Sequence, residues 1–474
     1  MPLPEVIEIV PLEKPVSASI AIPGSKSITN RALILAALAD DEVTLDGALW
    51  SEDTQAMTEC LQQLGFAVSV KEDPAEASNR TITVRGLGGK IPGGGTEQEP
   101  LELFVQNAGT AARFLTAFLC LGKGVYRLTG IDRMHERPQA ELFAALRELG
   151  YRLDSETDKL PATIHGVGPL PGECRVSIEK SSQFASALLL CAKHGQWRVE
   201  IDEYSDEGVN THAGSNSPYV AMTEKLIASF PSRGGLFQIE PDASSGSYFQ
   251  LASWIANCLP GAGLAQVFQS AKSAKDGDGV SEEAKRMASN RARLKASVAG
   301  WPETDWQIDA RFTDFRLYGL ATSIQEISRQ TDLGDSILTA MVMAPFASHP
   351  IRFTHLGRLR LQECERVVAM RTELSKCGVE VVEDGDTLIV EPSVARIHGA
   401  EIETYNDHRI AMCFATLGLK VPGIKIKNPA CVKKTFPNFF QKLAAPPPNG
   451  LDASILDATG KTARSLSPED LFAD

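Results

Sequence analysis

Residues 24–39 of the chain read GSKSITNRALILAALA and join a cluster of small polar residues directly to an apolar segment. Serine at such a start can cap a helix, and an apolar surface nearly all round is typical of a helix enclosed by other structure. The same arrangement recurs at residues 107–122, 181–195, 242–256, 333–347 and 405–419. Six buried helices are therefore predicted, spaced by roughly 60 to 90 residues, which leaves room for one structural repeat each.

Short runs between these segments have the alternating or β-branched pattern of half-buried strands. They are TITVRGL from Thr81, RVSIEK from Arg175, LFQIEP from Leu236 and TLIVEP from Thr387. The sequence therefore predicts an α/β fold of two similar domains, each built of three repeated βαβαββ-type units with buried helices.

The crossovers between repeats predict where the domains divide. We expect the first domain at residues 23–241 and the second at residues 1–22 together with 242–443. Residues 444–474 are rich in proline and small residues and show no periodicity, which predicts a flexible tail.

The composition restricts the classes of function. The chain of 474 residues is 43% hydrophobic and 23% charged, as in ordinary globular proteins, with a formal net charge of -13. Such a charge argues against nonspecific binding to nucleic acid or acidic membranes, because both need a surplus of Lys and Arg. The nine cysteines are scattered singly, which predicts free thiols and no metal site.

The start of the sequence and its apolar runs bear on location. No basic region followed by an apolar run opens the chain, as a signal peptide would require. The apolar runs last about a dozen residues, short of the roughly 20 needed to cross a bilayer. We therefore expect a cytoplasmic protein without a membrane segment.

The starts of the six helices predict where ligands bind. A helix amino terminus offers unpaired N–H groups and partial positive charge, which suit phosphate or carboxylate. Lys26 and Arg31 add cations to the first of these starts. For any single segment the alternative stays open that Ser and Asn merely cap the helix.

Eight motifs in order give the chain a resemblance to the enolpyruvyl transferases, and among them to those that use shikimate-3-phosphate. They are PGSKSITNRAL, NAGTAARF, DRMHERP, SSQF, DASSGSYF, QECER, YNDHRIAM and KTFPNFF, spread over about residues 20–443. The resemblance implies the enolpyruvyl transferase fold and transfer of the enolpyruvyl group of phosphoenolpyruvate to the 5-hydroxyl of shikimate-3-phosphate. It also implies release of phosphate, the absence of any cofactor, and a monomer.

The resemblance assigns the chemistry to three residues. Asp335 would hydrogen-bond the attacking ring hydroxyl and help remove its proton, and Glu363 would protonate the methylene carbon. Lys26 would contact the phosphoenolpyruvate. Such a pair of carboxylates is needed because addition places a proton on carbon and elimination then removes one.

The resemblance also implies a set of substrate-binding residues. They are Ser27, Arg31, Asn107, Gly109, Thr110, Arg133, Ser181, Ser182, Gln183, Tyr219, Gln362, Arg366, Arg409 and Lys434. Arg113 and Arg137 lie beside this set and could instead pair structural carboxylates. Asp407 and His408 are expected to orient Arg409.

Some positions depart from the family pattern. Relatives usually have Asn at Arg358, Lys at Gln362 and Ser at Asn216, and many have Pro at Phe114. Residues 257–305 match worst and include a charged stretch that could form an exposed helix. Two alternatives stay open: the sister enzyme that uses a UDP-sugar, although DRMHERP lacks its loop cysteine, and a noncatalytic protein that binds shikimate-like anions.

Overall fold

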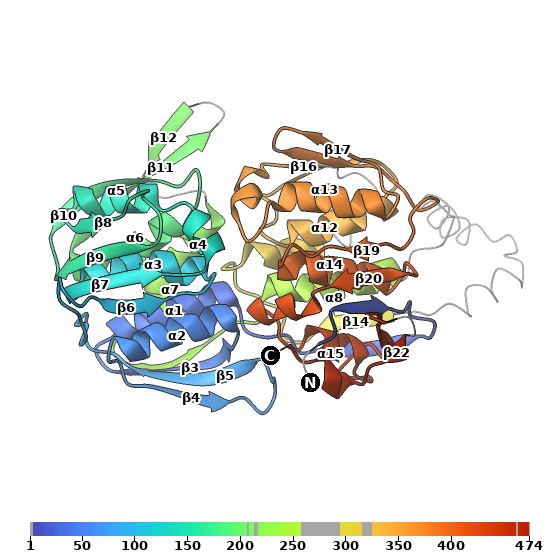
Figure 1. Ribbon diagram of the computed structural model, residues 1–474, viewed down its shortest axis with the longest axis horizontal. Helices are drawn as coiled ribbons and strands as arrows, with labels where there is room; N and C mark the ends of the chain where they lie inside the picture. Colours follow the sequence, from blue (N-terminus) through green and yellow to red (C-terminus); the bar gives the residue numbers. More distant parts are fainter. Residues whose placement is uncertain are drawn as a thin grey trace, which may run out of the picture.

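The computed structural model describes residues 3–205, 208–212, 217–256, 294–314, 325–460 and 463–473, and it forms two lobes that lie side by side (Figure 1). Each lobe surrounds its own hydrophobic cluster. The cluster of the first lobe runs from Ile28 to Ile239, and that of the second combines Ile7 to Ile22 with Tyr248 to Ala473. The domain boundaries at residues 23 and 241 stay a prediction.

The first lobe contains three sheets and seven helices among the described residues. Its strands are β3 (Glu42–Leu49), β4 (Val68–Glu72), β5 (Asn79–Arg85), β6 (Leu101–Phe104), β7 (Lys123–Thr129), β8 (Arg152–Asp154), β9 (Ala162–Val167), β10 (Gly172–Ser177), β11 (Trp197–Ser205), β12 (Gly208–His212) and β13 (Gly235–Gln238). Its helices are α1 (Lys26–Leu38), α2 (Glu52–Gln63), α3 (Gly109–Cys120), α4 (Asp132–Glu136), α5 (Ala140–Glu148), α6 (Gln183–Gly195) and α7 (Pro218–Ser229).

The second lobe is likewise built of short strands and helices. Its strands are β1 (Val6–Ile9), β2 (Val16–Ile20), β14 (Leu294–Val298), β15 (Glu326–Ser328), β16 (Ile351–Thr354), β17 (Val381–Asp384), β18 (Thr387–Val390), β19 (Glu401–Ile402), β20 (Ile424–Lys427), β21 (Ile455–Asp457) and β22 (Arg464–Ser465). Its helices are α8 (Ala243–Ala256), α11 (Phe312–Asp314), α12 (Ile337–Met343), α13 (Arg366–Lys376), α14 (His408–Gly418) and α15 (Phe439–Ala444).

A βαβαββ unit is clearest once in each lobe. In the first, β6 pairs parallel with β7, which pairs antiparallel with β9, and β9 pairs with β8. In the second, β15, β16, β18 and β17 repeat this order and these directions. The α/β fold with repeated units is therefore confirmed.

The six apolar segments are confirmed as buried helices. All 12 residues of α3 and all 11 residues of α14 are buried. Burying one Leu or Ile side chain contributes about 1.5–3 kcal/mol to the free energy of folding, so these helices stabilise the two cores. The predicted capping is mostly wrong, because the side chains of the N-cap residues Ser25, Ser182 and Ser336 make no capping hydrogen bond within the described structure, whereas Asp407 caps α14.

The two chain crossovers between the lobes bond to each other. Ser25 N donates to Glu240 O at 2.8 Å, and Asp242 N donates to Pro23 O at 2.9 Å. Gly24 is required at this crossing, because a Cβ there would collide with the carbonyl oxygen of Gly47. The pairing places the starts of α1 and α8 beside each other at the junction of the lobes.

One expectation about the irregular segments is wrong, and another is not tested. The predicted flexible tail instead carries β21, which pairs antiparallel with β1, and its Leu451, Ile455 and Leu471 are fully buried. The sequence gives no period there because the strands are only two or three residues long. Only the last five residues of the charged stretch are described, and they form the strand β14, which is parallel to β2; an exposed helix before them stays a prediction. Residues 257–293 and Asn216 lie outside the described residues.

Candidate active site

One cavity lies where the starts of helices from both lobes meet. Residues at the starts of α1, α3, α6, α8 and α14 line it. Among the residues predicted for the site, those that line it are Lys26, Ser27, Arg31, Gly109, Thr110, Ser181, Ser182, Gln183, Tyr219, Asp335, Gln362, Glu363 and Arg409. Converging helix starts give such a cavity a positive potential.

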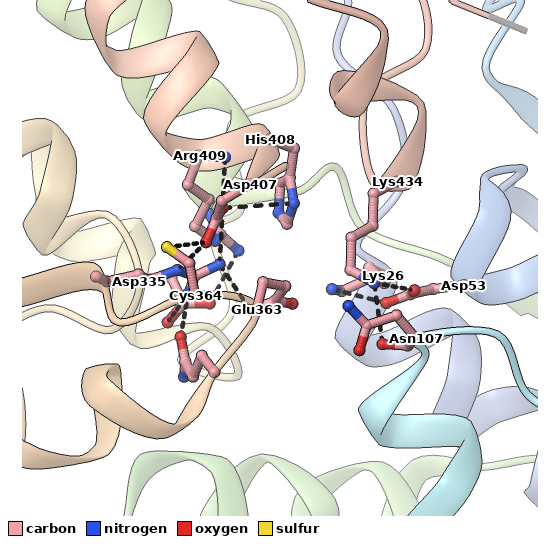
Figure 2. A network of polar contacts seen from close by, with 12 residues as sticks. Lys26, Asp53, Asn107, Asp335, Glu363, Cys364, Asp407, His408, Arg409 and Lys434 are labelled. Atoms are coloured by element: carbon pink, nitrogen blue, oxygen red, sulfur yellow. Dashed lines mark hydrogen bonds and ion pairs between the residues drawn. The ribbon is translucent and has the colours of Figure 1, made fainter. Parts of the chain in front are cut away.

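Two lysines from different lobes share one buried carboxylate (Figure 2). Lys26 Nζ lies 3.0 Å from Asp53 Oδ2, and Lys434 Nζ lies 2.8 Å from Asp53 Oδ1. Lys434 Nζ also donates to Asn107 O at 3.0 Å. Burial opposes ionisation of Asp53, but the two ammonium groups outweigh it and lower the pKa of this carboxyl below its usual value. The group as a whole keeps a surplus positive charge.

Two buried guanidinium groups lie at the start of α3. Arg137 Nη1 donates to Asn107 O at 3.0 Å, and Arg113 Nη1 donates to Gly109 O at 3.2 Å. Neither forms an ion pair with a carboxylate of the described residues, so the structural alternative for these arginines is not supported. Burial lowers the pKa of both groups. A Cβ at Gly109 would collide with both guanidinium groups.

The two predicted proton-handling carboxylates lie in one network of guanidinium groups (Figure 2). Arg366 Nη2 lies 2.8 Å from Glu363 Oε2, and Arg366 Nη1 lies 3.8 Å from Asp335 Oδ1. Arg409 Nη2 lies 3.0 Å from Asp335 Oδ2. Asp407 orients Arg366, whose Nε lies 2.7 Å from its carboxylate, and it caps α14 by accepting from the backbone N of Arg409 at 2.9 Å.

The charge of these carboxylates depends on their cationic surroundings. Burial alone would raise the pKa of Glu363, but Arg366, Arg137 and Lys26 hold it well below the usual value. Burial is likewise outweighed at Asp335, whose pKa is lowered by Arg409 and Arg366. Both are therefore ionised at neutral pH. A bound anion that neutralises the cations would raise both pKa values again.

Arg31 is held by protein groups on all three nitrogens. Its Nε donates to Thr223 Oγ1 at 2.7 Å, its Nη1 to Ser27 O at 2.8 Å, and its Nη2 to Ser186 Oγ at 3.1 Å. Burial lowers the pKa of Arg31 to about 10. In this structure the residue ties α1 to α6 and α7 more than it faces a ligand.

Four of the predicted residues stand behind the lining. Asn107 O accepts from Lys434 Nζ, Lys434 Nζ in turn pairs with Asp53, and Arg366 pairs with Glu363. Arg133 spans the lobes instead of facing the cavity: its Nη2 donates to Gln362 O at 2.8 Å and its Nε to Glu363 O at 3.2 Å. Arg133 therefore fixes the backbone that carries Glu363.

The family model for EPSP synthase (3-phosphoshikimate 1-carboxyvinyltransferase) matches residues 10–443 of the chain. The chain belongs to the EPSP synthase family. A protein of Opitutus terrae named 3-phosphoshikimate 1-carboxyvinyltransferase is 37% identical over 473 residues, covering 94% of this chain and 98% of its own. One of the same name from Trichormus variabilis is 35% identical over 462 residues, covering 92% and 98%.

Solved structures support the fold. EPSP synthase from Acinetobacter baumannii superposes with a TM-score of 0.65 at 20% identity, covering 95% of this chain and 99% of that one. The enolpyruvyl transferase NikO from Streptomyces tendae gives a TM-score of 0.62 at 14% identity, covering 98% and 100%.

Three charged side chains at the site of this EPSP synthase family member were not predicted from its sequence. Asp53 bridges Lys26 and Lys434, residues that are far from each other in the chain. Asp309 accepts from Gly334 N at 2.8 Å and so holds the turn before α12. Arg329 Nη2 lies 3.0 Å from Asp335 Oδ1. No local sequence pattern marks Asp53, because its partners come together only in the fold.

His408 lies at the edge of the network, with its Nδ1 3.7 Å from Asp407 Oδ1 (Figure 2). It is fully buried, and neither ring nitrogen has a hydrogen-bond partner among the described residues. Burial, together with Arg409 and Lys26, lowers its pKa well below the usual value. The imidazole is therefore neutral at physiological pH.

Among the described residues, no group of three His, Cys, Asp or Glu side chains could hold a metal ion. The described cysteines are all free and buried, and burial raises the pKa of Cys60 to about 12. No described helix is long and apolar enough to span a bilayer.

Proposed function

We propose that this protein transfers the enolpyruvyl group of phosphoenolpyruvate to the 5-hydroxyl of shikimate-3-phosphate and releases phosphate, a step of the shikimate pathway towards chorismate and the aromatic amino acids. The observation that carries the proposal is the position of Asp335 and Glu363. Both lie in one guanidinium network and line the same cavity as Lys26. We also propose that it acts as a cytoplasmic monomer without a cofactor.

The phosphoenolpyruvate would bind near the start of α3. Lys26, Lys434, Arg113 and Arg137 surround that region with one carboxylate, Asp53, among them. Two of these four cations have no carboxylate partner among the described residues. A molecule with a phosphate and a carboxylate supplies the missing negative charge.

The shikimate-3-phosphate would bind near the start of α6. Ser181, Ser182 and Gln183 line the cavity there, and the buried Oε1 of Gln183 has no partner among the described residues. Hydroxyl groups and a helix start suit a phosphate. Tyr219 and Asp335 line the same space, so the ring hydroxyls would lie near the carboxylate of Asp335.

The reaction then proceeds by addition and elimination. The 5-oxygen forms a bond to C2 of phosphoenolpyruvate and gives its proton to Asp335, while Glu363 donates a proton to C3. The tetrahedral intermediate loses a C3 proton to Glu363, and the C2–O bond to phosphate breaks with its electron pair on the phosphate. The substrate anions offset the cations around Glu363, so its pKa rises when it must carry a proton.

Phosphate release in a steady-state assay tests the proposal. The purified protein should release phosphate only when shikimate-3-phosphate and phosphoenolpyruvate are both present. Release with a UDP-sugar acceptor instead would assign the protein to the sister activity. Binding of both compounds without any turnover would support the noncatalytic alternative.

A further inference from the structure

Arg329 is a buried arginine that the mechanism above does not use. It follows β15 in the second lobe, is 8% exposed, and lines both the substrate cavity and a second cavity beside it. Its backbone N donates to Thr354 O of the neighbouring strand β16 at 3.1 Å. The strand pair therefore holds this side chain at the junction of the two cavities.

The guanidinium of Arg329 forms one ion pair and keeps an unused donor. Its Nη2 lies 3.0 Å from Asp335 Oδ1, while the other oxygen of Asp335 lies 3.0 Å from Arg409 Nη2. Its Nε is buried and has no partner among the described residues. Two guanidinium groups thus share one carboxylate, which leaves a surplus positive charge and an unsatisfied N–H.

Arg31 and Arg366 have more protein partners than Arg329, whereas Arg409 resembles Arg329 in keeping a buried Nε without a partner among the described residues. Arg31 donates from each of its three nitrogens to protein oxygens. Arg366 is held by Asp407 at 2.7 Å and by Glu363 at 2.8 Å. Arg329 is therefore well placed to offer its donors to a ligand oxygen.

The start of α6 contributes to the same space from the first lobe. Lys180 lines both cavities, as Arg329 does, and Ser181 and Ser182 line the larger one. Lys180 Nζ also lies 2.7 Å from Glu141 Oε1, so Arg329 is the less engaged of these two cations. Hydroxyl groups at a helix start that face a guanidinium group suit a phosphate better than a hydroxyl or a carboxylate.

We propose that Arg329 binds the phosphate of the acceptor from the second lobe, opposite the start of α6, and through its ion pair also positions Asp335. The inference rests on the proposed function for the identity of the acceptor. It links recognition of the phosphate to the orientation of the residue that receives the hydroxyl proton.

The test measures the affinity of Arg329→Met for shikimate-3-phosphate and for shikimate, which lacks the phosphate, by calorimetry or competition. We expect the affinity for shikimate-3-phosphate to fall about 10- to 100-fold, because the phosphate contact is lost. The affinity for shikimate should change less than about threefold, because Asp335 keeps its ion pair with Arg409 at 3.0 Å. Arg329→Lys should restore part of the lost affinity. Arg352→Met serves as the control, since Arg352 lies on β16 with its side chain 46% exposed.

An equal loss of affinity for both ligands would overturn the inference, because Arg329 would then act only through Asp335 or the fold. The pH dependence gives a second measurement. The wild-type preference for the phosphorylated ligand should grow as pH rises through about 6, where phosphate becomes a dianion, and Arg329→Met should flatten this rise. Wild-type protein that releases no phosphate with both substrates would contradict the proposed function instead, and it would do so whatever the binding data show.

Discussion

At the residue scale, the site is a set of charges that are unbalanced until ligands bind. Asp53 joins two lysines, and Asp335 joins two arginines at 3.0 Å each. In both places one carboxylate serves two cations. The substrates are anions, so their negative charges offset the surplus positive charge of these groups.

Lys26→Ala should lower turnover by at least about 100-fold and leave the fold intact. Its ammonium would stabilise charge that develops on the phosphoenolpyruvate, and losing such a contact costs this order of rate. The fold should persist because Lys434 still pairs with Asp53 at 2.8 Å. Phosphate release and thermal unfolding measure the two effects, and a variant with wild-type rates would refute the role.

Asp53→Asn should destabilise the free protein by about 3 kcal/mol at pH 7, because two buried lysines lose their carboxylate. The folded pKa of Asp53 is lowered, so its contribution is fully present above about pH 4 and is lost as pH falls through the folded value. Urea unfolding from pH 3 to 8 should show the difference from wild type shrinking only at the acidic end. A difference that stays constant down to pH 3 would contradict this account.

At the element scale, buried helices deliver their starts to one cavity. α3 and α14 are enclosed along their whole length, and their first residues reach the cavity. Short strands fix the helices in place, including β21 of the chain's last segment, which extends the sheet of β1. The last segment is therefore part of the second lobe's structure.

Ile455→Ala in β21 should lower the free energy of unfolding by about 2 to 5 kcal/mol. The side chain is fully buried against the second core, so its loss creates a cavity. Leu236→Ala, at a position that is 66% exposed, should change it by less than about 0.5 kcal/mol. If chemical denaturation showed that both substitutions change the free energy of unfolding equally, residues 444–474 would be a flexible tail after all.

Elements that depend on local sequence patterns could be predicted, and those that depend on residues distant in the chain could not. The six helices and several strands could be predicted because their patterns are local and long. β22 spans two residues, and β21 is a strand only because β1 lies beside it, so no local pattern marks either. Asp53 was missed for the same reason: its partners Lys26 and Lys434 come together only in the fold.

At the scale of the whole molecule, side-chain hydrogen bonds join the two lobes in addition to the two chain crossovers. Arg133 of the first lobe holds the backbone of Gln362 and Glu363, and Arg358 Nε donates to Glu179 O at 3.0 Å. A buried group away from the cavity adds to this: Asn438 donates to Glu76 at 2.6 Å and accepts from Ser78 at 2.6 Å. Hydrogen bonds beside the cavity and away from it therefore hold the two lobes together.

Asn438→Ala should destabilise the protein by about 1 to 3 kcal/mol, because it leaves the buried hydroxyl of Ser78 without its acceptor and removes one donor from Glu76, which keeps Lys442 at 2.7 Å. It should also separate the unfolding of the lobes into two transitions in urea. Lys225→Ala removes an ion pair whose side chains are 39% and 81% exposed and should have little effect. A single unshifted transition in Asn438→Ala would show that the contact does not join the lobes.

The central claim is that Asp335 and Glu363 move protons during addition and elimination in one shared site. The most direct measurement runs the reaction with both substrates in deuterated water and determines deuterium in the methylene group of the product by mass spectrometry. Because Glu363 would deliver a solvent-derived deuteron to C3 before elimination, the account predicts deuterium in that methylene group. Product formed at normal rate without deuterium would contradict it.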